Sequence, residues 1–128
     1  IDSPAGLGPG FRLAVCGADR AIVVAVSDPS SLRDAQRVVT QLSQLETIHL
    51  VVNRVRPRLL RRQNTTIDDA MDTAGLPLLG LVPEDPKVVL AATEGRPLAQ
   101  LGARRGAVRA YENIARRITG HQVPLMRI

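Results

Sequence analysis

The sequence predicts an α/β protein built on a doubly wound, mostly parallel β-sheet. Continuous apolar runs occur at residues 21–26, 48–53 and 78–82, and such runs are typical of strands that helices cover on both faces. The stretches between them have helical spacing, and short links between alternating strands and helices favour parallel pairing. Aromatic residues make up only 2% of the 128-residue chain, so its core must consist of Val, Leu, Ile and Ala.

The first predicted strand, residues 21–26, ends in the turn-forming sequence SDPS. A helix is expected over residues 31–45, because apolar side chains recur there at three- and four-residue spacing. Asp28 and Asp34 flank the start of this helix, and by themselves both are most simply interpreted as N-capping groups.

The second strand, residues 48–53, is closed by a polar stretch, and a short helix is expected over residues 66–74. Gly75 follows that helix at the position where a left-handed residue ends many helices. The pattern thus predicts a strand–helix unit that leads directly into the third strand.

The third strand, residues 78–82, is stopped by Pro83, and Pro86 lies where a helix tolerates proline in its first turn. The last helix is expected over residues 103–119. We therefore expect one domain portion over residues 1–120 and a short tail over residues 121–128.

The charge and the single cysteine give weaker indications. The net charge is +5 and Lys87 is the only lysine, so the surplus is carried by arginine. It can attract phosphate or anionic lipid, or it can reflect an arginine-rich codon usage, and the composition does not decide between them.

Cys16 lies in an apolar stretch and is predicted to be a buried structural thiol. One cysteine forms no internal disulfide, as is usual in the cytoplasm.

Ligands of parallel sheets bind beyond the carboxyl ends of the strands. The sequence DSPAG, which begins at Asp2, has the form of a strand end, and Asp2 is a candidate Mg²⁺ ligand because this cation prefers oxygen ligands. Gly6 would let a backbone N–H group approach a terminal phosphate. A strand-ending turn whose aspartate caps the next helix is an equally simple interpretation of this segment.

Two further strand ends offer groups that suit a purine base. Asn53 and Arg54 end the second strand, and the asparagine amide presents donors and an acceptor. Pro83, Glu84 and Asp85 end the third strand, where a rigid proline and backbone groups could line the same base. Each segment alone also fits an ordinary loop.

An arginine cluster follows the second strand, with five arginines in residues 53–62. It fits either a phosphate-binding patch for duplex nucleic acid or a solvated connector. The near absence of aromatic residues argues against stacking on single strands.

Taken in order, the segments DSPAG, DPSSLRDAQR, VVNRVRP, LLGLVPEDPKV and AYENIARR resemble the second half of the MinD septum-site ATPases. That family belongs to the deviant-Walker P-loop ATPases, together with the ParA partition proteins. The resemblance covers essentially the whole chain. It implies a partial P-loop NTPase fold without its N-terminal phosphate-loop half, and a role in an ATP-dependent switch that places the division septum.

The resemblance also implies roles for individual residues. Asp2 resembles the Walker B aspartate that positions Mg²⁺, and Gly6 resembles part of the switch that senses the γ-phosphate. Asn53 with Arg54, and the turn Pro83-Glu84-Asp85, resemble the adenine-recognition elements. Asp34 falls in a segment that lies, in the family, near the ATP-dependent dimer interface and the partner surface.

Two departures from the family pattern stand out. Leu7 is followed by Gly8, where the family often carries a glutamate. No sequence of the GKGGxGKT type is present, and phosphoryl transfer depends on the positioning and charge neutralisation that such a loop supplies. We therefore expect the 128-residue chain alone neither to hydrolyse ATP nor to bind it well.

The resemblance implies ATP and Mg²⁺ as cofactors of the complete protein, an ATP-dependent homodimer, and the division-inhibitor and regulator proteins of the Min system as partners. It implies a place in the cytoplasm or peripherally at the inner face of the cell membrane. The tail is too short for the family's membrane-targeting helix, so autonomous membrane binding is not expected. A ParA-like role in positioning DNA or cargo, and a non-catalytic partner-binding module, stay open as alternatives.

Overall fold

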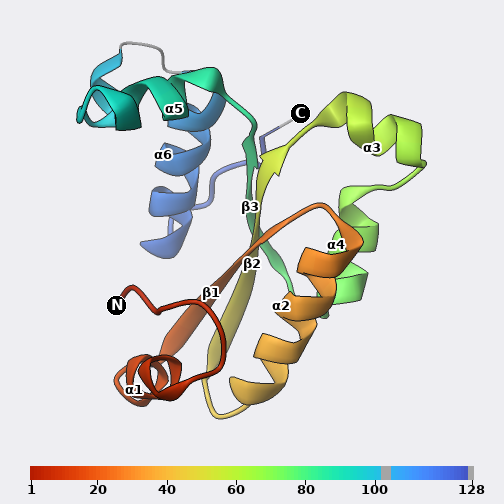
Figure 1. Ribbon diagram of the computed structural model, residues 1–128, viewed down its shortest axis with the longest axis vertical. Helices are drawn as coiled ribbons and strands as arrows, with labels where there is room; N and C mark the ends of the chain where they lie inside the picture. The colour runs from red at the N-terminus through yellow and green to blue at the C-terminus, as the bar shows by residue number, and fades with distance from the viewer. Residues whose placement is uncertain (102–104, 127–128) are drawn as a thin grey trace.

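The computed structural model describes residues 1–101 and 105–126 of the chain. Its centre is a parallel sheet of three strands in sequential order, β1 (Arg20–Val26), β2 (Thr47–Val55) and β3 (Leu78–Pro83). Figure 1 shows the sheet edge-on, with helices on both sides. The α/β class and all three predicted strands are confirmed, and β2 is longer than expected at both ends.

Helices lie on both faces of the sheet. Helices α2 (Pro29–Gln41) and α4 (Ile67–Ala74) pack on one face, and α6 (Gly106–Ile118) packs on the other (Figure 1). Neighbouring residues of β2 therefore point into different cores. Leu50 and Val52 contribute to the core under α2 and α4, and Val51 contributes to the core under α6. Burial on both faces explains why β2 and β3 read as continuous apolar runs.

Strand β1 departs from this pattern. Val23 and Ala25 are buried toward α2, but Ile22 is 42% exposed and Val24 is 61% exposed on the opposite face. Among the described residues β1 pairs only with β2, so its other edge is open. The expectation that helices cover both faces of all three strands is therefore wrong for β1 in this chain.

The two residues predicted to cap α2, Asp28 and Asp34, differ in their contacts. Asp28 is the N-cap, and its carboxylate accepts the backbone N–H groups of Ser30 (3.1 Å) and Ser31 (3.0 Å). Asp34 lies beyond the unpaired N–H groups of the first turn, is exposed, and pairs with Arg37 at 3.4 Å. The capping prediction is confirmed for Asp28 and wrong for Asp34.

The later helices begin and end close to their predicted bounds. Thr66 and Asp69 form a reciprocal capping box at the start of α4, and Gly75 ends that helix at φ +67°. Helix α5 (Pro86–Thr93) has its proline in the first turn. Helix α6 ends at Ile118, and the predicted start of this helix, at residues 103–104, lies outside the described residues.

Three elements were not predicted: α1 (Pro9–Cys16), α3 (Pro57–Gln63) and the 3₁₀ turn η1 (Leu98–Leu101). In α1, Gly10 leaves room for Pro4, whose Cγ would lie 2.7 Å from a Cβ at that position. Phe11 is the buried side chain of this helix, and Cys16 is exposed at its end. The prediction of a buried thiol is wrong, because α1 turns Phe11 and Val15 toward the core and leaves Cys16 exposed at its end.

Residues 121–126 have no regular secondary structure, yet they pack against the domain. The Arg117 guanidinium holds them by donating to the carbonyl oxygens of Val123 (2.9 Å) and Leu79 (2.8 Å). Met126 packs on the core beneath α6. Within the described parts of the chain, no helix has the length and apolar character needed to cross a membrane.

Candidate functional site

The carboxyl ends of β2 and β3 meet at a β-bulge. The register runs from Val52 opposite Leu81 to Val55 opposite Pro83, so β2 contains one more residue than β3 over this stretch. Arg54 takes a left-handed conformation (φ 52°), and the Asn53 side-chain oxygen accepts the Arg54 N–H at 2.9 Å. Bulges of this kind commonly redirect side chains next to functional sites.

Glu84 joins the turn after β3 to the end of β2. Its backbone N–H donates to the Val55 carbonyl oxygen at 3.0 Å. Its carboxylate accepts two bonds from Arg56, one of them 2.6 Å long at Nη2, and a further bond from Arg54 at 3.2 Å. The Arg56 hydrogen bond is the main cause that lowers the pKa of Glu84 below its ordinary value. The Glu84 carboxylate is therefore engaged by arginine.

Asp85 lies between two helix starts. One carboxylate oxygen accepts the backbone N–H of Lys87 in α5 at 3.0 Å, and the other accepts the backbone N–H of Ala107 in α6 at 3.1 Å. The turn Pro83-Glu84-Asp85 is thus attached to β2 on one side and to both following helices on the other. This gives the turn a fixed shape.

A hollow of about 240 Å³ opens at the carboxyl ends of β1 and β2. It combines the negative charge of Asp28 with the positive charges of Arg54 and Arg56. A hydrogen bond from the Ser30 hydroxyl is the main cause that lowers the pKa of Asp28. The remaining lining comes from β1, the turn after it, and α3: Val26, Ser27, Leu59 and Gln63. This is the end of a parallel sheet at which ligands bind.

The predicted site residues fall into two groups. Asn53, Arg54 and the turn at residues 83–85 lie together at the carboxyl ends of β2 and β3. Asp2 and Gly6 lie in the exposed N-terminal segment, where Gly6 (φ +86°) and its neighbours line a different hollow beside β1 and α2. Asp2 lies in the segment before α1, and its placement beside the strand ends that carry Asn53 stays a prediction.

The chemistry of Asp2 suits Mg²⁺ only as one ligand among several. The described part of the chain contains no cluster of three His, Cys, Asp or Glu side chains able to hold a metal ion. Mg²⁺ usually takes one or two carboxylates and completes its shell with waters and substrate phosphates. A single exposed aspartate therefore fits a magnesium ion that arrives with a phosphate ligand.

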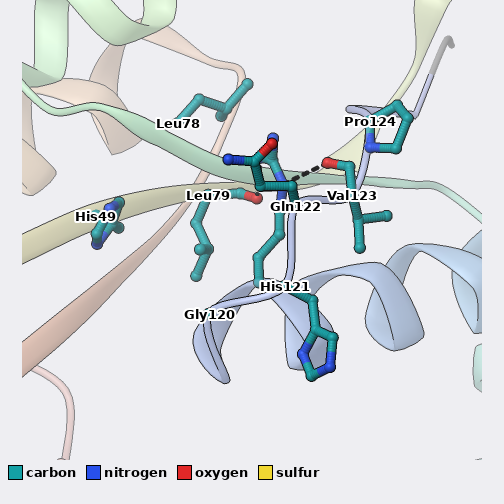
Figure 2. Close-up of a pocket in the computed structure, with 9 residues that line it drawn as sticks. His49, Leu78, Leu79, Gly120, His121, Gln122, Val123 and Pro124 are labelled. Atoms are coloured by element: carbon teal, nitrogen blue, oxygen red, sulfur yellow. Dashed lines mark hydrogen bonds between the residues drawn. The ribbon is translucent and has the colours of Figure 1, made fainter.

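A larger hollow, of about 650 Å³, lies at the opposite end of the sheet (Figure 2). It is lined by His49, Leu78, Leu79, Arg117 and the segment after Gly120. His49 and His121 lie on opposite sides of Leu79 in Figure 2, and the His121 ring lies 3.0 Å from the Thr119 hydroxyl. This hollow is at the amino-terminal ends of β2 and β3, away from the site predicted by the strand-end rule.

Two contributors to the site could not be assigned from the sequence. Arg56 was recognisable only as one member of the arginine cluster, and its pairing with Glu84 depends on the parallel register of β2 and β3. Ala107 donates its backbone N–H to Asp85, and such a bond does not depend on the type of the donor residue, so no sequence pattern indicates it.

Comparison with known proteins identifies the relatives of this chain. No family model matches it. The septum site-determining protein MinD of Bacillus subtilis (strain 168) is 44% identical over 129 residues, which span 98% of this chain and 48% of that protein. The chain therefore spans about half the length of the curated relatives it matches.

Solved structures agree with the sequence match. The MinC:MinD cell division protein complex of Aquifex aeolicus superimposes with a TM-score of 0.90 at 35% identity, over 98% of this chain and 52% of that chain. MinD from Pyrococcus horikoshii OT3, complexed with Mg-ADP, gives a TM-score of 0.79 at 27% identity, over 94% of this chain and 49% of that chain.

The parallel sheet, its strand-end turn and these structural neighbours define the class: part of an α/β P-loop NTPase domain. Within that class, the chain corresponds to the C-terminal part of a MinD-type septum-site ATPase. The recognition made from the sequence segments is confirmed.

Proposed function

We propose that this chain is the base-recognising, C-terminal part of an ATP-dependent switch ATPase that helps to place the division septum. The main observation in support is the turn Pro83-Glu84-Asp85, fixed beside Asn53 at the carboxyl ends of two parallel strands. The MinD relatives support the cell-division role. They do not favour the ParA-like alternative.

In this proposal the residues that contact the nucleotide and the residues that position the turn are different. The Asn53 amide and the Pro83 ring contact the purine, together with backbone groups of the turn. Arg54 and Arg56 hold Glu84 and so keep the turn against β2. Asp2 holds Mg²⁺, and Gly6 approaches the γ-phosphate; its left-handed backbone and exposed position suit that contact.

ATP and Mg²⁺ are the proposed ligands of the complete protein, since the P. horikoshii relative is complexed with Mg-ADP. The bound nucleotide supplies the phosphate to be transferred, and this chain supplies recognition of the base. The 128 residues contain no phosphate-loop sequence, so we propose that they hydrolyse no ATP by themselves.

The proposed partners are a second copy of the complete protein and Min-system proteins, since one structural relative is a MinC:MinD complex. Asp34, exposed on α2 and paired only at its surface with Arg37, is the proposed partner-facing residue. We propose that the complete protein works in the cytoplasm, with a peripheral place at the inner face of the cell membrane.

Base recognition is tested by measuring the affinity of the complete protein for ATP and for inorganic tripolyphosphate. Asn53→Ala is expected to weaken ATP binding about tenfold, the effect of one lost hydrogen bond to the base, and to leave tripolyphosphate binding unchanged. Asn113→Ala on α6 serves as the matched control. Equal loss for both ligands would contradict the assignment of Asn53 to the base.

The ParA-like alternative makes a different prediction. It requires duplex DNA binding that falls steeply with salt and is abolished by replacing Arg58, Arg61 and Arg62 on α3 with glutamine. Our proposal predicts no such binding at physiological salt. Salt-sensitive duplex binding that depends on these three arginines would favour the alternative.

A further inference from the structure

We propose that Asp85 is a positioning residue for base recognition, which acts by capping two helices at once and does not contact the nucleotide. This inference rests on the function proposed above and changes the role that the sequence suggested for Asp85. It follows from three contacts of the residue and its neighbours.

The first is the division of the carboxylate between two helices. One oxygen accepts the Lys87 N–H within α5 at 3.0 Å, and the other accepts the Ala107 N–H of α6 at 3.1 Å, 22 residues further along the chain. Helix N-termini carry unpaired N–H groups and partial positive charge, so an aspartate between two of them is held by both. Turning toward a purine would cost it one of these bonds.

The second is the fit of Gly106 against the same carboxylate. Gly106 has φ +60°, and a Cβ at this position would lie 2.4 Å from the Asp85 oxygen that bonds Ala107. A side chain here would displace the carboxylate or the start of α6. Glycine at this position is therefore what permits the contact between Asp85 and Ala107.

The third is the anchoring of α6 to the sheet. Ile114 packs where β3 carries Gly80, since a Cβ on that glycine would lie 2.4 Å from Ile114 Cγ1. Farther along the helix, Arg117 donates to the Leu79 carbonyl oxygen at 2.8 Å. Because α6 is fixed on β3, the bond from Asp85 to Ala107 fixes the turn relative to the sheet.

These contacts place the turn between two attachments. Glu84 holds it to β2 through Arg56, and Asp85 holds it to α6. Loss of the second attachment leaves Pro83 free to shift relative to Asn53. The residues that contact the base would remain, with their spacing no longer fixed.

The experiment compares the ratio of affinities for ATP and inorganic tripolyphosphate in the complete protein. Asp85→Asn retains an oxygen for only one of the two N–H groups, and Gly106→Ala disturbs the same contact while leaving Asp85 in place. Partial unfolding lowers the apparent affinity for both ligands by the same factor. The ratio of the two affinities therefore reports on base recognition alone. Thr66→Ala removes the cap of α4, away from the turn, and is the matched control.

Both Asp85→Asn and Gly106→Ala are expected to lower the ratio of ATP affinity to tripolyphosphate affinity about tenfold, which is the effect of one lost charge-assisted hydrogen bond. Thr66→Ala is expected to leave this ratio unchanged. An unchanged ratio in the two test variants would overturn the positioning role. A change in Asp85→Asn alone would also overturn it, because it would indicate direct contact with the base. A wild-type protein with no preference for ATP would instead contradict the proposed function itself.

Discussion

Arg56 and Glu84, 28 residues apart in the chain, form a two-pronged ion pair between the end of β2 and the turn after β3. A guanidinium and a carboxylate have matching planar geometry, so this pair fixes direction as well as distance. The pair is half exposed, and its main effect is to hold the turn in register with the strand beside it.

This pair makes stability depend on acid pH. The folded protein lowers the pKa of Glu84 below its ordinary value of 4.5, chiefly through the Arg56 hydrogen bond. The unfolded chain therefore binds a proton more readily, and the stabilisation is present above pH 4.5 and is lost as the pH falls through the folded pKa. Glu84→Gln should be less stable than wild type near neutral pH and converge with it in acid.

Urea unfolding between pH 7 and pH 3 checks this prediction, with the exposed Glu112→Gln as control. A difference between wild type and Glu84→Gln that stays constant down to acid pH would show that Glu84 is not held by Arg56.

The close approach of β3 and α6 predicts a strong effect at Gly80. Gly80→Ala would place a Cβ 2.4 Å from Ile114 Cγ1, and overpacking of this kind typically costs about 1–3 kcal/mol. Ile114→Ala makes room for the added methyl group, so the double variant should lose less stability than the sum of the two single variants. Strictly additive losses in chemical unfolding would contradict the packing described for this pair.

The open edge of β1 predicts self-association of the isolated chain. Within the described residues no second strand pairs with this edge, and the same strand carries exposed apolar side chains, of which Val24 is 61% exposed. Val24→Lys should reduce the association measured by sedimentation and leave stability nearly unchanged. Leu13→Lys, which replaces an exposed residue of α1, is the control and should have little effect on association. Equal effects of both variants would indicate general hydrophobic association.

Sequence reasoning recovered the parts of the fold that depend on local pattern. The apolar runs predicted all three strands, and Gly75 at the end of α4 and the first-turn proline of α5 helped to predict those helices. Helix α3 was missed because its arginine-rich sequence has no buried side chain and so shows no apolar periodicity.

The site was predictable only in part. Asn53, Arg54 and the turn at residues 83–85 were correctly expected at neighbouring strand ends, since parallel strands bring their carboxyl ends together. The double cap by Asp85 could not be predicted, because it joins residues 22 apart through a backbone group. The assignment of Asp2 and Gly6 to the phosphate and Mg²⁺ stays a prediction.

The most direct test is ATP hydrolysis by this chain, alone and after fusion to the N-terminal half of B. subtilis MinD, the 44% identical relative. The chain should show no turnover alone and Mg²⁺-dependent turnover in the fusion, with Asn53→Ala raising the ATP concentration needed for half-maximal rate. Turnover by the 128-residue chain alone, or a folded fusion protein that neither binds nor hydrolyses ATP, would contradict the account.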